Sequence, residues 1–304
     1  MKGFIAKILI FSILPFLSLF WIVSLENGET DYFYNKISSP RKKSIIFGTS
    51  KSEQGIIPSI LNGKIEGSDF YNFSFALSIS PYGKTYFESI KDKVNYSEPD
   101  GIFILTIDPW AVASFKEDEE NELIFEETQS FLSTIPSVTI NPNIFYLKDF
   151  FLKPFFEILL RKFKSGNFVL HDDGWLEVIV STEPEDRKER VSQRLMEYKK
   201  RNENYILSHK RFDYFEKIII ELKNQGKVFI VRLPVEEKFA EYESDYEVQF
   251  NYRLNEILVK HKLNYLDFTK GDLEKWSYID GIHLDRNSAK LITNELSDWI
   301  LSYH

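Results

Sequence analysis

Five short apolar runs alternate along the chain with longer segments in which apolar positions recur at helical spacing. The runs lie at residues 44–47, 69–75, 101–107, 227–233 and 264–268, and the helical patterns lie at residues 84–94, 185–223, 246–261 and 288–301. Runs so rich in Ile, Leu, Val and Phe are typical of strands that are buried on both faces. We therefore predict an α/β fold with three layers: a parallel sheet with helices on both sides.

The N-terminal segment is the most apolar part of the chain. Residues 8–25 carry no charge, and residues 3–5 extend the segment past Lys7, whose ammonium can reach the interface. A stretch of this length can span a bilayer. Since no small-x-small cleavage pattern follows it, we expect an uncleaved single-pass anchor, with residues 3–25 in the membrane.

Basic residues stand on both sides of this segment, so charge alone does not orient it. Lys2 and Lys7 precede or interrupt it, and Lys36 and Arg41 lie among the basic residues that follow. A short tail ahead of the first apolar segment usually stays in the cytoplasm. We expect the rest of the chain to lie outside the membrane, in the periplasm or at the cell surface.

The domain organisation that we expect has an anchor at residues 1–30, a linker at residues 31–43 and one α/β domain at residues 44–304. Residues 111–187 depart from the alternation of strand and helix. Because this stretch leaves the sheet directly after the third strand, we expect an insertion that folds over the site end of the sheet as a cap.

Within this insertion, residues 144–163 form an aromatic and basic helical pattern. Such a helix can lie on a membrane surface, but packing within the cap is the interpretation that we favour. The basic side chains in and around it are Lys148, Lys153, Arg161, Lys162 and Lys164.

The same insertion contains the sequence His171-Asp172-Asp173-Gly174-Trp175. Its imidazole and carboxylates suggest a metal site, yet Asp-Asp-Gly is also an ordinary turn, which we favour. We therefore predict no metal and no cofactor.

Composition excludes several kinds of partner and site. With a net charge of -8 and a pI near 5.4, the chain lacks the excess of basic residues that binds nucleic acid, so we expect no nucleic-acid partner. The absence of cysteine excludes disulfides, thiolate metal sites and a cysteine nucleophile.

Ser50 occupies a position suited to a nucleophile. It follows the first predicted strand in the sequence Gly48-Thr49-Ser50, on the turn that leads into a helix. There a hydroxyl projects above the sheet, and the N–H groups of the helix start point into the same space. A helix cap is the simpler interpretation of Ser50 alone, and Ser52 is a nearby competitor.

Asp280 and His283 supply the other parts of an acid–base system. Among the five histidines, His283 is the one with an aspartate three residues before it. In a loop at the carboxyl end of the sheet, this spacing lets the carboxylate orient the imidazole while its other nitrogen faces a serine. We therefore predict that Ser50 and His283 lie within hydrogen-bonding distance.

Gly48-x-Ser50 on the first turn and Asp280-x-x-His283 before the last helix resemble the SGNH (GDSL-like) hydrolase family. The resemblance covers roughly residues 44–301, apart from residues 111–187. It implies a flavodoxin-like fold in which Ser50 is the nucleophile and Asp280 and His283 complete a triad that transfers acyl groups to water or to a sugar hydroxyl.

The anchor, together with Thr49 where the family signature has Asp, looks most like the membrane-tethered branch that modifies exported polysaccharides, of the alginate-acetylation and teichoic-acid-alanylation type. This resemblance implies a glycan substrate, a location outside the cytoplasm and a membrane-bound O-acyltransferase as partner.

Two elements depart from the family pattern on the oxyanion side. The second block lacks the family's Gly, which leaves Asn72, Ser74 and a backbone N–H near Ala76 as candidate donors. In the third block Asp108 stands near the place of the family's Asn. An ionised Asp108 would destabilise an oxyanion about 4 Å away by about 4 kcal/mol at an effective dielectric near 20. A protonated Asp108 could instead donate a hydrogen bond to the oxyanion, and an Asp108 side chain that points away from it could bind a sugar hydroxyl.

Two further residues are candidates for substrate binding. Trp110 can stack on a sugar, although burial is the commoner fate of such a side chain. Arg232, at the end of the fourth predicted strand, either lines the site or forms a surface salt bridge.

Two functions are therefore open. The first is a membrane-anchored O-acyltransferase or serine esterase that acts through an acyl-enzyme. The second, motivated by Asp108, is a catalytically inactive SGNH-like binding or scaffold subunit of a polysaccharide modification or export complex.

Overall fold

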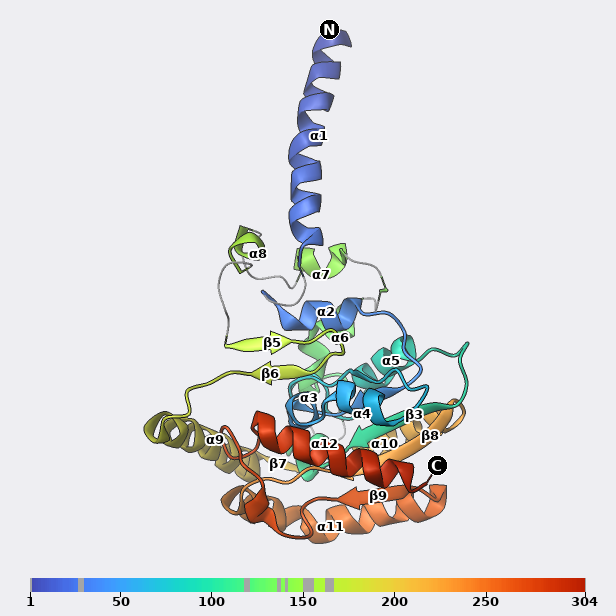
Figure 1. The fold of residues 1–304 in the computed structure, drawn as a ribbon, viewed down its shortest axis with the longest axis vertical. Helices are drawn as coiled ribbons and strands as arrows, with labels where there is room; N and C mark the ends of the chain where they lie inside the picture. Colours follow the sequence, from blue (N-terminus) through green and yellow to red (C-terminus); the bar gives the residue numbers. More distant parts are fainter. Residues whose placement is uncertain are drawn as a thin grey trace.

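A five-stranded parallel sheet lies at the centre of the molecule (Figure 1). The computed structural model describes residues 2–26, 30–117, 121–135, 138–139, 142–149, 156–161 and 167–303. The strand order is β2-β1-β3-β8-β9, and each predicted apolar run supplies one strand. Their bounds are Ile45–Phe47 for β1, Tyr71–Asn72 for β2, Gly101–Thr106 for β3, Gly226–Arg232 for β8 and Asn264–Asp267 for β9. The predicted α/β fold with a parallel sheet is confirmed.

Helices cover both faces because successive strand side chains point in opposite directions. On β1, Ile46 belongs to one buried cluster, whereas Ile45 and Phe47 belong to the other. The first cluster is covered by α4 (Pro58–Lys64) and α12 (Arg286–Leu301), and α3 (Ser50–Gly55) packs against α12. The second is covered by α5 (Lys84–Lys93), α10 (His209–Lys223) and α11 (Glu237–His261).

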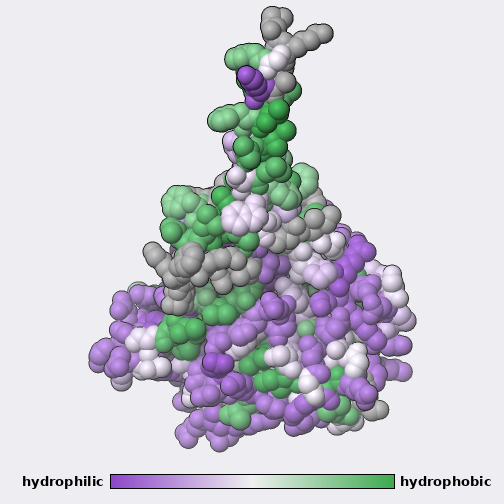
Figure 2. Space-filling view, turned by 45° about the horizontal axis from the view of Figure 1, so that its top comes forward, coloured by the Kyte–Doolittle hydropathy of each residue, from purple (hydrophilic) through white to green (hydrophobic). Residues whose placement is uncertain are grey.

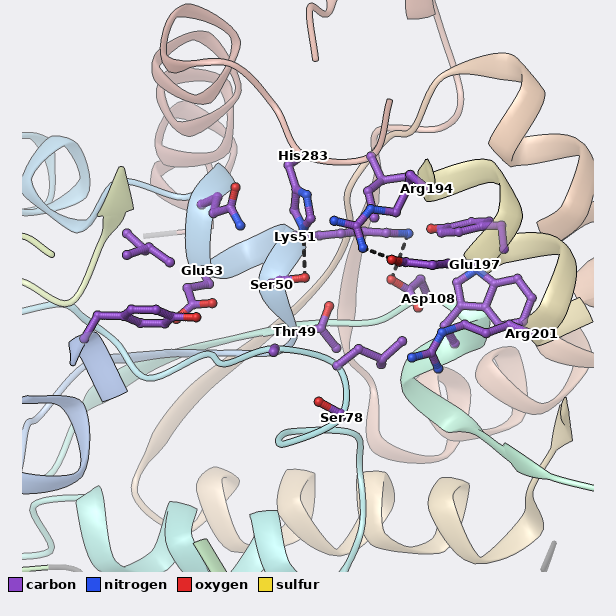
Figure 3. A pocket seen from close by; sticks show the side chains of 18 residues that line it. Thr49, Ser50, Lys51, Glu53, Ser78, Asp108, Arg194, Glu197, Arg201 and His283 are labelled. Carbon is purple, nitrogen blue, oxygen red and sulfur yellow. Dashed lines mark hydrogen bonds and ion pairs between the residues drawn. The ribbon is translucent and has the colours of Figure 1, made fainter. Parts of the chain in front are cut away.

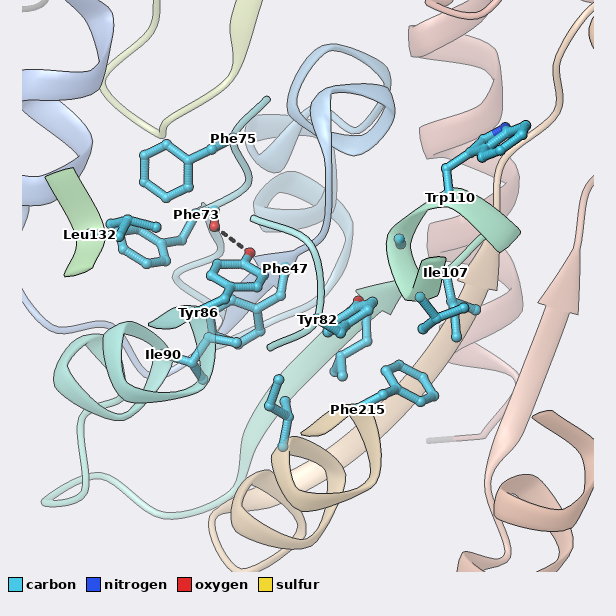
Figure 4. Close-up of a cluster of buried hydrophobic side chains, with 14 of the residues drawn as sticks. Phe47, Phe73, Phe75, Tyr82, Tyr86, Ile90, Ile107, Trp110, Leu132 and Phe215 are labelled. Carbon is cyan, nitrogen blue, oxygen red and sulfur yellow. Dashed lines mark hydrogen bonds between the residues drawn. The ribbon is translucent and has the colours of Figure 1, made fainter. Parts of the chain in front are cut away.

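A cluster of buried aromatic rings supports the turn that follows β1 (Figure 4). The hydroxyl of Tyr86 donates to the carbonyl of Phe73 at 2.7 Å and accepts from the N–H of Gly48 at 3.0 Å. Gly48 is needed here because a Cβ would lie 1.9 Å from Thr106 Oγ1. The turn that presents Ser50 is thus held from below by the core.

The predicted helical stretch at residues 185–223 is wrong in one respect, because a strand interrupts it. The structure has α9 at Pro184–Asn204, β7 at Tyr205–Leu207 and then α10. β7 pairs antiparallel with β4 (Ala113–Phe115). The side chain of Ser208 accepts from the N–H of Arg211 and so begins α10 anew.

The N-terminal helix α1 (Lys2–Ser24) projects away from the rest of the molecule (Figure 1). Its window Lys7–Ser24 has a mean hydropathy of 2.1, and 6% of that window is buried. Among the described residues it is the helix long and apolar enough to cross a membrane.

The segment at residues 31–43, expected to be a linker, contains a helix that is part of the domain. In α2 (Tyr32–Ser38) the side chains of Tyr34, Lys36 and Ile37 are buried. Lys36 Nζ lies 2.8 Å from Glu53 Oε1 on α3. Since both partners are almost fully buried, α2 is attached to the helix that begins at Ser50.

Residues 111–187 form short elements, most of which lie between the sheet and α1 (Figure 1). Of the predicted helix at residues 144–163, the structure describes helical segments at residues 144–149 and 156–161. Residues 150–155 and 162–166, including Lys153, Lys162 and Lys164, lie outside the described residues. The elements in and next to this stretch are η1 (Pro109–Val112), η2 (Glu126–Gln129), α6 (Phe131–Thr134), α7 (Ile144–Asp149), α8 (Phe156–Arg161), β5 (Phe168–Leu170) and β6 (Leu176–Val178). A last short helix, η3 (Leu273–Lys275), follows β9.

Candidate active site

A pocket of about 290 Å³ lies at the carboxyl end of the sheet, where β1 and β3 lead into α3 and η1. Ser50 is the first residue of α3, and His283 lies in the loop between η3 and α12. The pocket is lined by Tyr32, Thr49, Ser50, Lys51, Glu53, Gln54, Ala76, Leu77, Ser78, Asp108, Trp110, Leu176, Arg194, Glu197, Tyr198, Arg201, Ile282 and His283.

The three residues predicted to form a triad lie in a hydrogen-bonded row, and Figure 3 shows the part of it that joins Ser50 and His283. Ser50 Oγ lies 2.9 Å from His283 Nε2, and His283 Nδ1 lies 2.8 Å from Asp280 Oδ2. Because the carboxylate accepts the Nδ1 proton, Nε2 is left to accept the proton of Ser50. The geometry is that of a nucleophile, a base and an orienting acid.

The carboxylate of Asp280 is fixed by several donors. Its Oδ1 accepts from the N–H groups of Ile282 and His283, and its Oδ2 also accepts from Nε and an Nη of Arg194, at 3.1 and 3.0 Å. Burial alone raises the pKa of Asp280, but the attraction of His283 and Arg194 outweighs it and holds this pKa below its usual range. Asp280 is therefore ionised and oriented.

Three arginines on one face of α9 hold the loop that carries Asp280 and His283. Arg187 Nε donates to the carbonyl of Tyr278 and Arg190 Nε to that of Ile279, each at 3.0 Å, while Arg194 binds Asp280. Sequence reasoning missed these residues. The signal was their spacing of three and four residues, which puts side chains on the same side of a helix.

Two of the candidate oxyanion donors have other partners. The side-chain amide of Asn72 donates to the carbonyls of Ser52 and Ile56, and Ser74 Oγ lies 3.0 Å from Ser52 Oγ. Both are fully buried beneath the pocket, so the prediction that they face a substrate is wrong. A buried amide needs partners, and the carbonyls of the neighbouring helix supply them.

The loop that contains Ala76 does line the pocket, together with Leu77 and Ser78. Figure 3 shows Ser78 and Thr49 on the same side of Ser50. Backbone N–H groups of this loop and of Ser50 are the remaining candidates for oxyanion donors.

Asp108 is paired with a cation that sequence reasoning missed. Its Oδ2 lies 3.0 Å from Nζ of Lys51, the residue after the candidate nucleophile, and its Oδ1 accepts the N–H of Ala111. Burial lowers the pKa of Lys51, but Asp108 and Glu243 outweigh burial and raise it well above its usual value. The negative charge of Asp108 is therefore compensated by a retained ammonium.

Arg232 belongs to the same buried network and does not line the pocket. Lys51 Nζ lies 2.8 Å from Glu243 Oε1, and Arg232 bridges Glu243 and Glu247 at 3.0 and 2.9 Å. Both predicted positions of Arg232 are wrong, because it is neither in the site nor in a surface salt bridge. Its guanidinium is needed to neutralise Glu243 inside the protein.

The wall formed by η1 and α9 combines buried and accessible polar groups. Trp110 lines the pocket but is 2% exposed, so it offers no ring face for stacking on a sugar. Arg194, Glu197 and Arg201 lie on one side of Ser50 and Glu53 on the other (Figure 3). Ser50 thus lies between the charged side chains of α9 and Glu53 of α3.

The turn at residues 171–175 is structural. Gly174 has φ +83°, and a Cβ there would lie 2.5 Å from the carbonyl oxygen of Asn72. Asp173 accepts the N–H of Ser59 at 2.9 Å, and Trp175 Nε1 donates to the carbonyl of Gln54 at 2.8 Å. This turn fastens the hairpin of β5 and β6 to α3 and α4. Within the described ranges, no group of three or more His, Asp or Glu side chains is arranged to hold a metal ion.

Comparisons with protein-family models, with curated proteins and with solved structures find no match to this chain.

Proposed function

We propose that the chain is a membrane-anchored, SGNH-like O-acyltransferase or esterase that works through Ser50, His283 and Asp280. The observation that carries the proposal is the continuous row of hydrogen bonds from Ser50 through His283 to Asp280, with Ser50 at the wall of a pocket. A structural cap of α3 would not require a buried, carboxylate-oriented imidazole beside the hydroxyl.

In the first half of the reaction, His283 Nε2 removes the proton of Ser50 as its Oγ attacks an acyl carbonyl. The carbonyl oxygen takes up the negative charge and is stabilised by N–H groups of Ser50 and of the loop at residues 76–78. As the intermediate collapses, the imidazolium returns its proton to the leaving oxygen. The products are acyl-Ser50 and the free alcohol of the donor.

In the second half, His283 removes a proton from a water molecule or an acceptor hydroxyl, which attacks acyl-Ser50. Collapse returns the proton to Ser50 Oγ and releases an acid or a new ester. Asp280 stays ionised throughout and stabilises the imidazolium of His283. General acid–base catalysis of the kind that His283 provides typically accelerates a reaction by a factor of about 10² to 10⁴.

The resemblance to the membrane-tethered SGNH branch supports the biological setting that we propose. The substrate is an exported or cell-surface glycan, the domain lies outside the cytoplasm, and a membrane-bound O-acyltransferase is the partner. Residues 111–187 act as a cap, to which Leu176 contributes at the pocket wall. A periplasmic reporter fused after His304 tests this topology, since activity of a cytoplasmic reporter alone would contradict it.

Labelling with a fluorophosphonate tests the catalytic proposal. We expect labelling of wild type and loss of label in Ser50→Ala. Ser52→Ala is the matched control, because Ser52 lies two residues away but donates to the carbonyl of Thr49 and does not line the pocket. Labelling that survives Ser50→Ala and disappears in Ser52→Ala would reassign the nucleophile.

The alternative is a non-catalytic binding or scaffold subunit, which Asp108 favours because it stands where the family has an oxyanion donor. Its pairing with Lys51 reduces that objection. If wild type neither reacts with the fluorophosphonate nor hydrolyses an acetyl ester faster than Ser50→Ala, the scaffold function is the correct one.

A further inference from the structure

The short helix α7 has buried apolar side chains on its inner face and both apolar and charged side chains on its outer face, where Lys148 and Asp149 are exposed and ion-paired. On the inner face Tyr146 and Leu147 are buried, and the Tyr146 ring lies 5.6 Å from that of Tyr34 on α2. On the outer face the exposed fractions of Ile144 and Phe145 are 63% and 57%. The helix is therefore packed on one side and uncovered on the other.

The helix α8 repeats this arrangement. Ile158 is buried in the same cluster as Tyr146, whereas the exposed fractions of Phe156 and Leu160 are 59% and 45%. α8 also packs against α1. α7 and α8 thus each leave two large apolar side chains exposed to solvent.

The uncovered side chains lie at the level where α1 joins the domain. From Lys7 to Trp21 the side chains of α1 are exposed, and burial begins at Val23, which shares a cluster with Tyr146 and Ile158. Figure 2 shows apolar surface gathered around this junction, while most of the visible surface farther from α1 is hydrophilic. The outer faces of α7 and α8 therefore continue the apolar surface of α1.

The region where α1 joins the domain is connected to α3, the helix that begins at Ser50. The chain passes from α1 into α2, and Lys36 of α2 is paired inside the protein with Glu53 of α3. Tyr146 donates to Asp31 at 2.7 Å, just ahead of α2. α7 is thereby connected, through Asp31 and α2, to α3, the helix that begins at Ser50.

We propose that the outer faces of α7 and α8 are seated in the bilayer at the boundary between headgroups and acyl chains. The proposal rests on α1 spanning the membrane, which is part of the proposed function. The occupant is lipid because the apolar surface is continuous with α1, and side chains at this depth are covered by lipid once α1 is inserted. The domain then lies against the membrane and holds the pocket at a set distance from it.

The absence of cysteine from the chain allows a direct test with single labels. Full-length Phe145→Cys and Phe156→Cys variants are labelled with an environment-sensitive fluorophore and reconstituted in nanodiscs that contain lipids brominated along the acyl chain. Leu14→Cys, in the middle of α1, reports insertion of the anchor. Val248→Cys, 86% exposed on α11, is the control remote from α1.

We expect brominated lipid to quench the labels at residues 145 and 156 to an extent closer to that at residue 14 than to that at residue 248. Quenching at residue 14 together with no quenching at residues 145 and 156 would overturn the proposal, and would mean that another protein or water covers these faces. Absence of quenching at residue 14 would overturn the premise that α1 is inserted. Fluorophosphonate labelling of the same samples reports separately on the catalytic proposal.

Discussion

Replacement of Lys51 by Met tests whether the ammonium of Lys51 makes the pocket tolerant of a developing negative charge. In wild type this ammonium lies 3.0 Å from Asp108 and 2.8 Å from Glu243. In Lys51→Met, Glu243 keeps Arg232 as a partner, but the carboxylate of Asp108 loses its cation at the pocket wall.

Two magnitudes are expected for this variant, the second for an oxyanion that forms about 4 Å from Asp108. An uncompensated buried charge costs about 3–5 kcal/mol of stability. An ionised Asp108 about 4 Å from the oxyanion would oppose it by about 4 kcal/mol at an effective dielectric of 20, and water in the open pocket reduces this to about 2–3 kcal/mol. We therefore expect kcat/KM for an acetyl ester to fall about 30- to 150-fold.

The double variant Lys51→Met/Asp108→Asn separates the effect of charge from loss of structure. Asn keeps an oxygen to accept the N–H of Ala111 and removes the charge. We expect it to regain most of the lost kcat/KM and most of the lost stability, measured by ester hydrolysis and urea unfolding in detergent. A folded Lys51→Met with kcat/KM within twofold of wild type would refute the reasoning.

Further predictions concern Arg194 in the site and two buried lysines. Arg194→Gln removes two hydrogen bonds to Asp280 Oδ2 but leaves the two backbone hydrogen bonds to Asp280 Oδ1. Since Arg194 is partly exposed, we expect steady-state assays to show a fall in kcat of about tenfold with little change in KM, and Arg194→Lys to regain part of the lost kcat. Lys36→Met leaves Glu53 buried without its cation, so we expect a loss of about 3–5 kcal/mol in urea unfolding, most of it recovered in Lys36→Met/Glu53→Leu. Burial lowers the pKa of Lys93 from 10.5 to about 7. Between these two pH values the unfolded chain binds more protons than the folded protein, so the free energy of unfolding should rise from about pH 7 to about pH 10 in wild type and rise less in Lys93→Met. An equal rise in both proteins would show that Lys93 stays charged in the folded state.

The central sheet was predictable because strands buried on both faces are written as continuous apolar runs. The break at Tyr205–Leu207 was not, because this three-residue strand exists through its pairing with β4, whose residues lie 90 to 94 positions earlier in the chain. Likewise the basic stretch after α1 looks like a linker until Lys36 meets Glu53 inside the protein. Elements that depend on local sequence pattern could be predicted, whereas β7 and α2, which depend on residues distant in the sequence, could not.

The candidate site likewise contains residues with a local sequence signal and residues whose partners are distant in the sequence. Ser50 follows a strand, and Asp280 stands three residues before His283, so both signals are local. Lys51 is 57 residues from Asp108, and Arg194 is 86 residues from Asp280, so neither pairing has a local signature. The oxyanion side was misread at Asn72, since only the folded chain shows that neighbouring carbonyls occupy its amide.

The measurement that tests the central claim most directly is the mass of the protein after brief mixing with an activated acetyl ester, followed by acid quenching and peptide mapping. We predict an acetyl group on the peptide that contains Ser50 in wild type, no adduct there in Ser50→Ala, and a strongly reduced rate of adduct formation in His283→Ala. No adduct on Ser50 in folded wild type, at any time before the ester is exhausted, would contradict the proposal that Ser50, His283 and Asp280 form a working acyl-transfer site.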